Sequence, residues 1–290
     1  MDDEIPYYKE VKVAGDSFIN KLKRVSTSAL FFITTFILSN LLLQVLIARM
    51  AVALKYKTRF TYTIIHVLPW DYHYWSRTNI VLIYFLPPIA CFVMGLFIFN
   101  LLQMYTNRIN IFRLFFFWFS VNITNLVLTN ALLSPLGSPS NRSNGLYQTF
   151  AVVGAFLWIS PVLMFIVAVG ALVVTILFGT WLRKEVLRYS FSNKLIKNKR
   201  GMDLVVVQVF MLPVLAGSLP VISLCGPIGF FTTVMQLANL GVISIGIFMM
   251  NSIEVTTTVR CSKDDVLNRF PIIELAICVA VWFVVFAFFK

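Results

Sequence analysis

The chain has 290 residues, of which 59% are hydrophobic and only 12% are charged, and its mean hydropathy is +0.85. A soluble domain carries about 25% charged residues, so this composition excludes a soluble globule and a disordered chain. The four cysteines are scattered, which excludes a disulfide scaffold. The net charge of +12 falls in short segments between long apolar runs, a pattern typical of an all-α integral membrane protein and not of a nucleic-acid-binding protein.

The first 27 residues predict a cytoplasmic N-terminal segment, followed by a single helical transmembrane domain over residues 28–290. Residues 16–25 have apolar and basic side chains on opposite faces of a helix, which predicts a short interfacial amphipathic helix capped by Asp16 or Ser17. The chain starts with acidic residues and its first apolar run is too long for a signal peptide, so we expect that run to remain as an anchor.

Seven apolar stretches are long enough to be transmembrane helices. They are residues 28–54, 78–105, 111–136, 147–182, 203–225, 228–251 and 270–289. The fourth has 36 residues, about 54 Å as an unbroken helix, so we expect it to tilt, to break near Pro161 or to extend into the cytoplasm. Only Gly226 and Pro227 separate the fifth and sixth stretches, and whether these are two full spans stays open.

Two segments between the spans are rich in β-branched and aromatic residues. They are residues 55–67 (KYKTRFTYTIIHV) and residues 253–261 (IEVTTTVRC). This composition is typical of strands at the membrane surface, although irregular loops would also accommodate it.

The distribution of basic residues predicts the orientation. With the N-terminus inside, 17 Lys and Arg residues fall in cytoplasmic segments and 6 fall on the opposite side. This bias predicts a cytoplasmic N-terminus and an external C-terminus. The segment after the first span runs against the bias, since it has basic residues on the outer side.

The sequence has none of the common catalytic motifs, such as HExxH, GxSxG, a Walker A loop or GxGxxG. His66 and His73, with Asp71 between them, could supply three ligands to a metal. The neighbouring Trp and Tyr residues favour an interfacial aromatic belt instead. We therefore expect a protein that is not an enzyme and that holds no cofactor or metal.

Three ionisable residues lie near the ends of predicted spans. Arg49 can extend to the outer interface, and Asp203 and Glu274 are placed in first helical turns, where the helix dipole favours a carboxylate. No Asp, Glu, Lys or His is predicted at the middle of a span. This pattern argues against ion-coupled pumping.

Neutral polar residues recur at helical spacing within the spans. They are Asn40, Gln44, Asn122, Asn125, Thr129, Gln208, Thr232, Gln236 and Asn239. Because unpaired amides are costly in hydrocarbon, these faces should point at each other, at a partner helix or into a polar cavity. Gly and Pro are frequent in the segment 213–229. Their density predicts either a kink and tight hairpin or the broken helices of a transporter.

Three segments carry a family resemblance: residues 34–40, residues 75–77 (WSR) and residues 112–125 (FRLFFFWFSVNITN). In these the chain resembles uncharacterised Bacteroidetes-type inner-membrane proteins, which are distantly similar to site-2-protease-like intramembrane metalloproteases. Such proteases require two helical histidines, a glutamate and a later aspartate, and the first and third spans contain none of them. The resemblance therefore implies a catalytically inactive relative, located in a bacterial cytoplasmic (inner) membrane.

We expect a non-enzymatic structural or accessory subunit of a larger membrane protein complex, in protein transport or maturation. Its partners would be the lipid bilayer and other integral membrane proteins, with no nucleic acid. One alternative is a small-molecule transporter or channel with a site at the broken helices 5 and 6. The other is a residual intramembrane metalloprotease-like protein.

Overall fold

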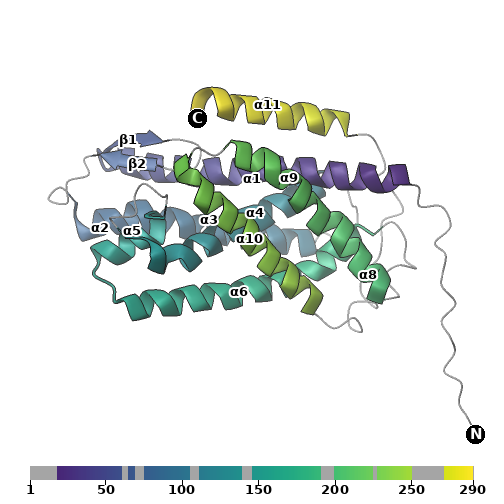
Figure 1. Cartoon of the computed structure of the whole chain (residues 1–290). Coiled ribbons are helices and arrows are strands. Elements are labelled where there is room, and N and C mark those ends of the chain that lie inside the picture. Colours follow the sequence, from purple (N-terminus) through teal and green to yellow (C-terminus); the bar gives the residue numbers. More distant parts are fainter. Residues whose placement is uncertain are drawn as a thin grey trace, which may run out of the picture.

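The computed structural model describes residues 18–60, 65–68, 75–104, 111–138, 146–190, 199–224, 227–249 and 271–289. Within these residues, six helices are long and apolar enough to cross a membrane, and they form a bundle of elongated helices (Figure 1). The sequence predicts seven such spans. The seventh stretch forms α11 (Ile272–Phe289), whose apolar part is shorter than that of the other six.

The first helix is longer than its predicted span. α1 (Phe18–Ala53) has 36 residues and contains no Gly or Pro that would interrupt it. The predicted interfacial helix is therefore wrong as a separate element, since residues 18–25 form the first turns of α1 and the predicted break at residue 28 does not occur. The predicted caps Asp16 and Ser17 lie outside the described residues.

A small antiparallel hairpin follows α1. β1 (Lys57–Phe60) pairs with β2 (Ile65–Leu68), and Lys57 lies opposite Leu68. The hairpin packs against α1, and Val67 is fully buried. It confirms the strand predicted within residues 55–67, and it is the one departure from an all-α fold in the described residues. The second candidate strand, residues 253–261, lies outside them.

Two spans contain a π-helical turn immediately before a Leu-Pro step. Their elements are α2 (Arg77–Ile80), η2 (Val81–Phe85) and α3 (Leu86–Met104), and α8 (Lys199–Val206), η5 (Val207–Met211) and α9 (Leu212–Ser223). Pro87 and Pro213 have no N–H for a helical bond, and their rings crowd the preceding turn. The backbone widens there, since the N–H groups of Leu86 and Leu212 bond five residues back. Both helices thereby continue through their prolines.

The fourth apolar stretch breaks next to the predicted proline. α5 (Thr149–Phe156) is separated from α6 (Pro161–Arg188) by a turn in which Trp158 has a φ of 56°. Ser160 caps α6, because its hydroxyl accepts a bond of 3.3 Å from the N–H of Leu163, and Pro161 takes the first helical position. The fifth and sixth stretches form two separate helices, both of spanning length.

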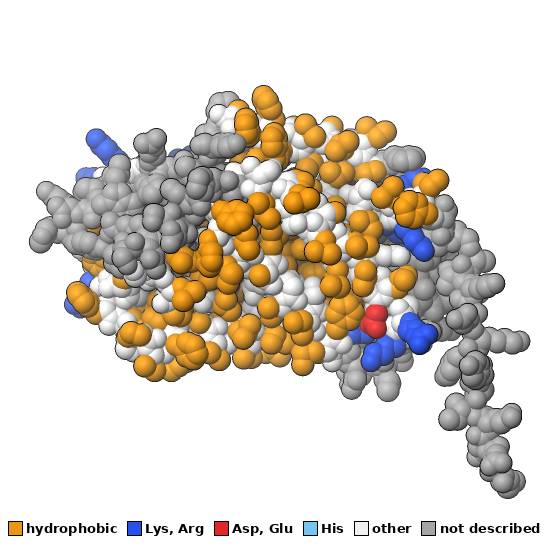
Figure 2. Space-filling view, in the orientation of Figure 1, with side chains coloured by type: hydrophobic (Ala, Val, Ile, Leu, Met, Phe, Trp, Pro, Cys, Tyr) orange, Lys and Arg blue, Asp and Glu red, His pale blue; other side chains and the backbone are white. Residues whose placement is uncertain are grey.

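α4 (Ile111–Leu133), followed by the short η3 (Ser134–Leu136), is at the centre of the bundle. It contacts α1, α3, α6 and α10 (Pro227–Met249). Trp118 of α4 anchors the core, with its ring 5.1 Å from that of Phe210 and 5.2 Å from that of Phe32. α6 and α11 are peripheral, and apolar side chains cover much of the outer surface, with charged ones near the ends (Figure 2).

Candidate functional site

The neutral polar residues predicted from the sequence are all buried, with exposures of 7% or less. Eight of them lie on three helices, and we call this set the polar seam. It consists of Asn40 and Gln44 on α1, Asn122, Asn125 and Thr129 on α4, and Thr232, Gln236 and Asn239 on α10. The ninth, Gln208, lies in η5 and not on one of these three helices.

The centre of the polar seam joins all three helices. The amides of Asn40 and Gln236 face each other at 3.3 and 3.4 Å. The Asn125 amide donates to the backbone carbonyl of Gln236 at 2.9 Å, and its side-chain oxygen accepts from the Asn239 amide at 3.0 Å. The predicted faces therefore point at each other within this chain.

A further level of polar contacts joins α1 and α4. The Asn122 amide donates to the Thr35 hydroxyl at 2.8 Å and to the carbonyl of Phe32 at 3.2 Å. Thr35 is a contact that was not predicted, because a threonine in an apolar run gives no signal of its partner on another helix. Buried amides that bond across helices in this way hold the helices in one register.

A hydroxyl group also connects α1 with the π turn of the fifth span. Ser28 donates to the carbonyl of Val209 at 2.8 Å and accepts from the indole N–H of Trp118 at 2.9 Å. In an α-helix the Val209 carbonyl would accept from residue 213, which is a proline without an N–H. Ser28 thus supplies a donor where the helix lacks one.

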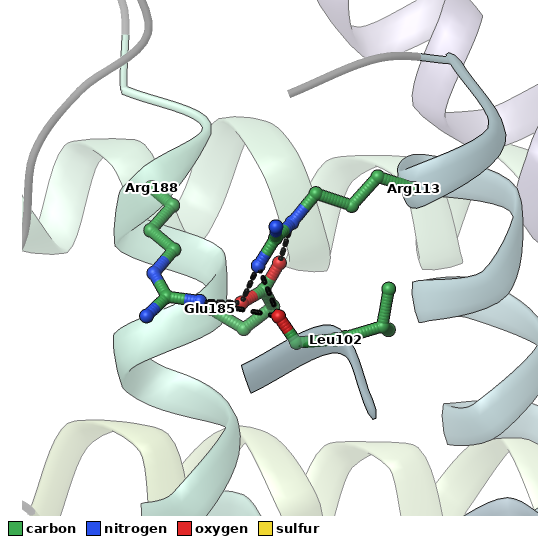
Figure 3. Close-up of polar contacts among 4 residues, drawn as sticks. All are labelled: Leu102, Arg113, Glu185 and Arg188. Carbon is green, nitrogen blue, oxygen red and sulfur yellow. Dashed lines mark hydrogen bonds and ion pairs between the residues drawn. The ribbon is translucent and has the colours of Figure 1, made fainter. Parts of the chain in front are cut away.

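Ionised side chains gather at one end of the bundle, which we call the collar end. The Glu185 carboxylate accepts hydrogen bonds from Nε and from one terminal nitrogen of Arg113, at 2.6 and 2.8 Å. It also accepts one from Arg188 at 2.8 Å (Figure 3). The carbonyl of Leu102 accepts from the same two arginines, at 2.6 and 3.5 Å. Glu185 and Arg113 are 0% and 5% exposed, so this is a buried, bidentate ion pair.

Arg183 makes an equivalent contact with α10. It is 1% exposed and donates to the carbonyl of Ile247 at 2.8 Å, while Asp203 lies 3.9 Å away. The last carbonyl groups of α3 and α10 accept no hydrogen bond from their own helices, and guanidinium groups donate to them instead. The positive charge of these groups also lies at the negative end of each helix dipole. We call Arg113, Arg183, Glu185 and Arg188 the arginine collar.

Tyr189 follows α6 at the arginine collar. Burial, with the nearby charge of Glu185, raises the pKa of this phenol well above its ordinary value, so the side chain stays neutral. Its ring lies 5.8 Å from that of Phe117. Two aromatic rings therefore pack beside the buried part of the collar, where low exposure to water strengthens the charged contacts.

The count of basic residues treats the collar arginines as cytoplasmic, although Arg113 lies within the predicted span of residues 111–136, and the sequence assigns Glu185 no role. The reason is that α6 continues to Arg188, six residues beyond the predicted end of its span. Asp203 is also corrected: α8 begins at Lys199, so Asp203 lies beyond the first turn. Glu274 does lie in the first turn of its helix, as predicted, and Arg49 is exposed near the far end of α1.

The structure describes only one of the three residues that were considered as possible metal ligands. His66 lies in β2 opposite Arg59, whereas Asp71 and His73 lie outside the described residues. Within the described ranges, no three His, Cys, Asp or Glu side chains gather in a way that could hold a metal. A cavity of about 750 Å³ lies at the break between α5 and α6, lined by Tyr147, Phe156 and Trp158 among others, and not at the polar seam.

Comparisons with protein-family models, with curated proteins and with solved structures find no match to this chain. The resemblance to site-2-protease-like proteins therefore stays a prediction. Within the described residues, six helices are long and apolar enough to cross a membrane, which is the composition of a helical membrane protein.

Proposed function

We propose that this protein is a non-enzymatic accessory subunit of a larger membrane assembly, one that acts in protein transport or maturation. The observation that carries the proposal is the separation of its surfaces: polar groups bond inside the bundle, and extended apolar faces remain outside. Within the described residues, this arrangement presents apolar contact surfaces at membrane depth.

The polar seam supports a structural role for the amides. Asn40, Asn125, Gln236 and Asn239 bond to one another or to the backbone. These groups are therefore used within the chain, and partner helices would have to be bound by other surfaces. Of the three orientations expected for these faces, contact with one another is the one that these bonds support.

The first half of α6 is the candidate surface for a partner. Between Pro161 and Thr175, the less exposed positions follow a single stripe through Met164, Ala168 and Ala171. The other faces are open, with Val162 70% exposed and Phe165 63% exposed. A helix held along one stripe can pack a partner helix on its remaining faces by van der Waals contact.

We also propose that the collar end faces the cytoplasm of a bacterial inner membrane. α1 begins at this end, and the basic residues of the collar and of α8 are located there. The excess of Lys and Arg in the corresponding segments supports this orientation. A reporter fused after residue 198 should lie on the cytoplasmic side, and an external location would reverse the topology.

Site-specific photo-crosslinking in intact membranes tests the proposed function. A photoreactive residue replacing Phe165 on α6 should give one protein adduct of defined mass, whereas the same residue replacing Leu219 of α9, 75% exposed, serves as the lipid-facing control. Lipid adducts alone at both positions, together with a monomer free of other membrane proteins in mild detergent, would contradict the proposal.

One observation favours the transporter alternative. The side-chain oxygens of Asn122 and Asn239 and the hydroxyl of Thr129 are buried without a hydrogen-bond partner in the described parts of the chain, a condition that ordered water commonly resolves. Cysteines placed at Gln208, Gln236 and Asn239 should react with a membrane-impermeant thiol reagent if a water-filled path exists. Protection at all three positions would eliminate the transporter.

A further inference from the structure

One face of the last turns of α6 changes from apolar to basic along the helix. Leu177, Trp181, Lys184 and Arg188 recur at spacings of four, three and four residues, which places them on one face. Leu177 is 57% and Trp181 58% exposed, and Lys184 is half-buried. The order apolar, aromatic, cationic matches the change from acyl chains to headgroups across a membrane surface.

The length of α6 places the two cations at headgroup depth. The helix has 28 residues, about 42 Å at 1.5 Å per residue, whereas the hydrocarbon core is about 30 Å thick. Several residues must therefore extend beyond the core. Lys184 and Arg188 lie in the last five residues, next to the ionised collar, and the exposed Trp181 lies where an interfacial ring is expected.

Both cations have donors to spare. Glu185 is one carboxylate shared by two guanidinium groups, so this part of the collar has a net positive charge. Arg188 uses one terminal nitrogen for Glu185 and Leu102, and its other terminal nitrogen is turned away from Glu185 (Figure 3). Within the described residues that nitrogen has no acceptor, and Lys184 has no ion pair.

We propose that Lys184 and Arg188 bind the phosphate of an anionic phospholipid from the leaflet at the collar end. The phosphate oxygens would accept charge-assisted bonds from the two side chains, and an acyl chain would lie along Leu177 and Trp181. The apolar part of the face favours a lipid over free phosphate, because free phosphate would leave Leu177 and Trp181 uncovered. The site does not depend on a partner subunit.

Lipid titration by native mass spectrometry tests this site. The full chain, purified in a neutral detergent and stripped of lipid, is titrated with phosphatidylglycerol and with phosphatidylcholine of the same acyl chains. Phosphatidylglycerol should bind more tightly, and Lys184→Gln should weaken it about fivefold, the value of one basic group near an anionic surface. Affinity for phosphatidylcholine should not change. The unfolding temperature of Lys184→Gln should equal that of the wild type, since Lys184 has no ion pair in the described residues.

Two variants serve as controls. Lys184→Arg keeps the charge and should keep the affinity, and Arg49→Gln removes an exposed cation near the opposite end of α1 and should change nothing. The proposal is overturned if Lys184→Gln and Arg188→Gln both bind phosphatidylglycerol as the wild type does. It is also overturned if the two lipids bind equally, or if inorganic phosphate at the same concentration displaces the lipid.

Discussion

The polar seam and the arginine collar solve different problems with different chemistry. In the seam, helices pass each other, and neutral amides bond at 2.8–3.4 Å. At the collar, α3 and α10 end, and arginines meet their free carbonyls and a buried carboxylate at distances down to 2.6 Å. Charged side chains are thus found where helix ends supply partners for them. Neutral polar side chains are found where helices cross and no helix end is available.

Removing the carboxylate of the collar should have the largest effect. Glu185→Gln leaves Arg113 and Arg188 without their shared anion, and loss of one partner of a buried ion pair costs about 3–5 kcal/mol. The free energy of unfolding, measured by SDS titration in mixed micelles, should fall by this amount. If Glu185→Gln lowers the free energy of unfolding only as much as the loss of a neutral seam residue does, the collar and the seam do not differ in the energetic value of their polar contacts.

The crossing of α6 and α10 near the collar should tolerate less added volume than the rest of α6. A Cβ at Gly179 would overlap the carbonyl oxygen of Ile243, and a Cβ at Gly246 would overlap that of Ile176. Gly179→Ala should therefore lower the free energy of unfolding by about 1–3 kcal/mol. The matched control is Gly170→Ala, because Gly170 has open space around it and alanine favours the helix by about 0.5–1 kcal/mol. Equal effects of the two would mean that the helices do not meet at this point.

The polar seam should show coupling between its members. Asn125→Leu leaves the Asn239 amide and the Gln236 carbonyl without their partner and should cost about 1–2 kcal/mol. The double variant Asn125→Leu with Asn239→Leu should lose less than the sum of the single variants, since both bonding groups are then gone. Strictly additive losses in the same SDS titration would indicate that the two amides do not interact.

The smallest effect is expected at the exposed part of the collar. Asp203 is 35% exposed and 3.9 Å from Arg183, so Asp203→Asn should change the free energy of unfolding by less than about 1 kcal/mol. Compared with Glu185→Gln, it removes the same charge at the same end of the bundle. A loss as large as that of Glu185→Gln would mean that burial does not set the difference.

Hydropathy and spacing were sufficient to predict most of the spans and the polar faces. Four predicted stretches match spans of the structure to within a few residues, because a membrane span depends mainly on its own composition. These spans are Arg77–Met104, Ile111–Leu136, Lys199–Ser223 and Gly229–Met249. Asn122, Asn125, Gln236 and Asn239 were identified because helical spacing places polar residues on one face. Which faces meet is a property of the packed bundle, and the sequence leaves it open.

The arginine collar was not predicted, and the reason differs from that for the packing of the polar faces. Arg113 and Glu185 are 72 residues apart in the chain, and a basic residue at the end of a span has the same appearance whether it faces solvent or a neighbouring helix. Only the extension of α6 to Arg188 turns Glu185 inward. The break before Pro161 was predictable because proline and a serine cap act locally.

The contact between Ser28 and Val209 has a consequence for the biogenesis of this protein. The two residues are 181 positions apart, so the carbonyl in the π turn remains without this hydroxyl donor until the fifth span meets the first. During synthesis α1 would be inserted long before that meeting. The assembly step that closes the bundle is therefore a late, long-range one, and replacing Ser28 by alanine should delay the arrival of protease resistance in newly made chains.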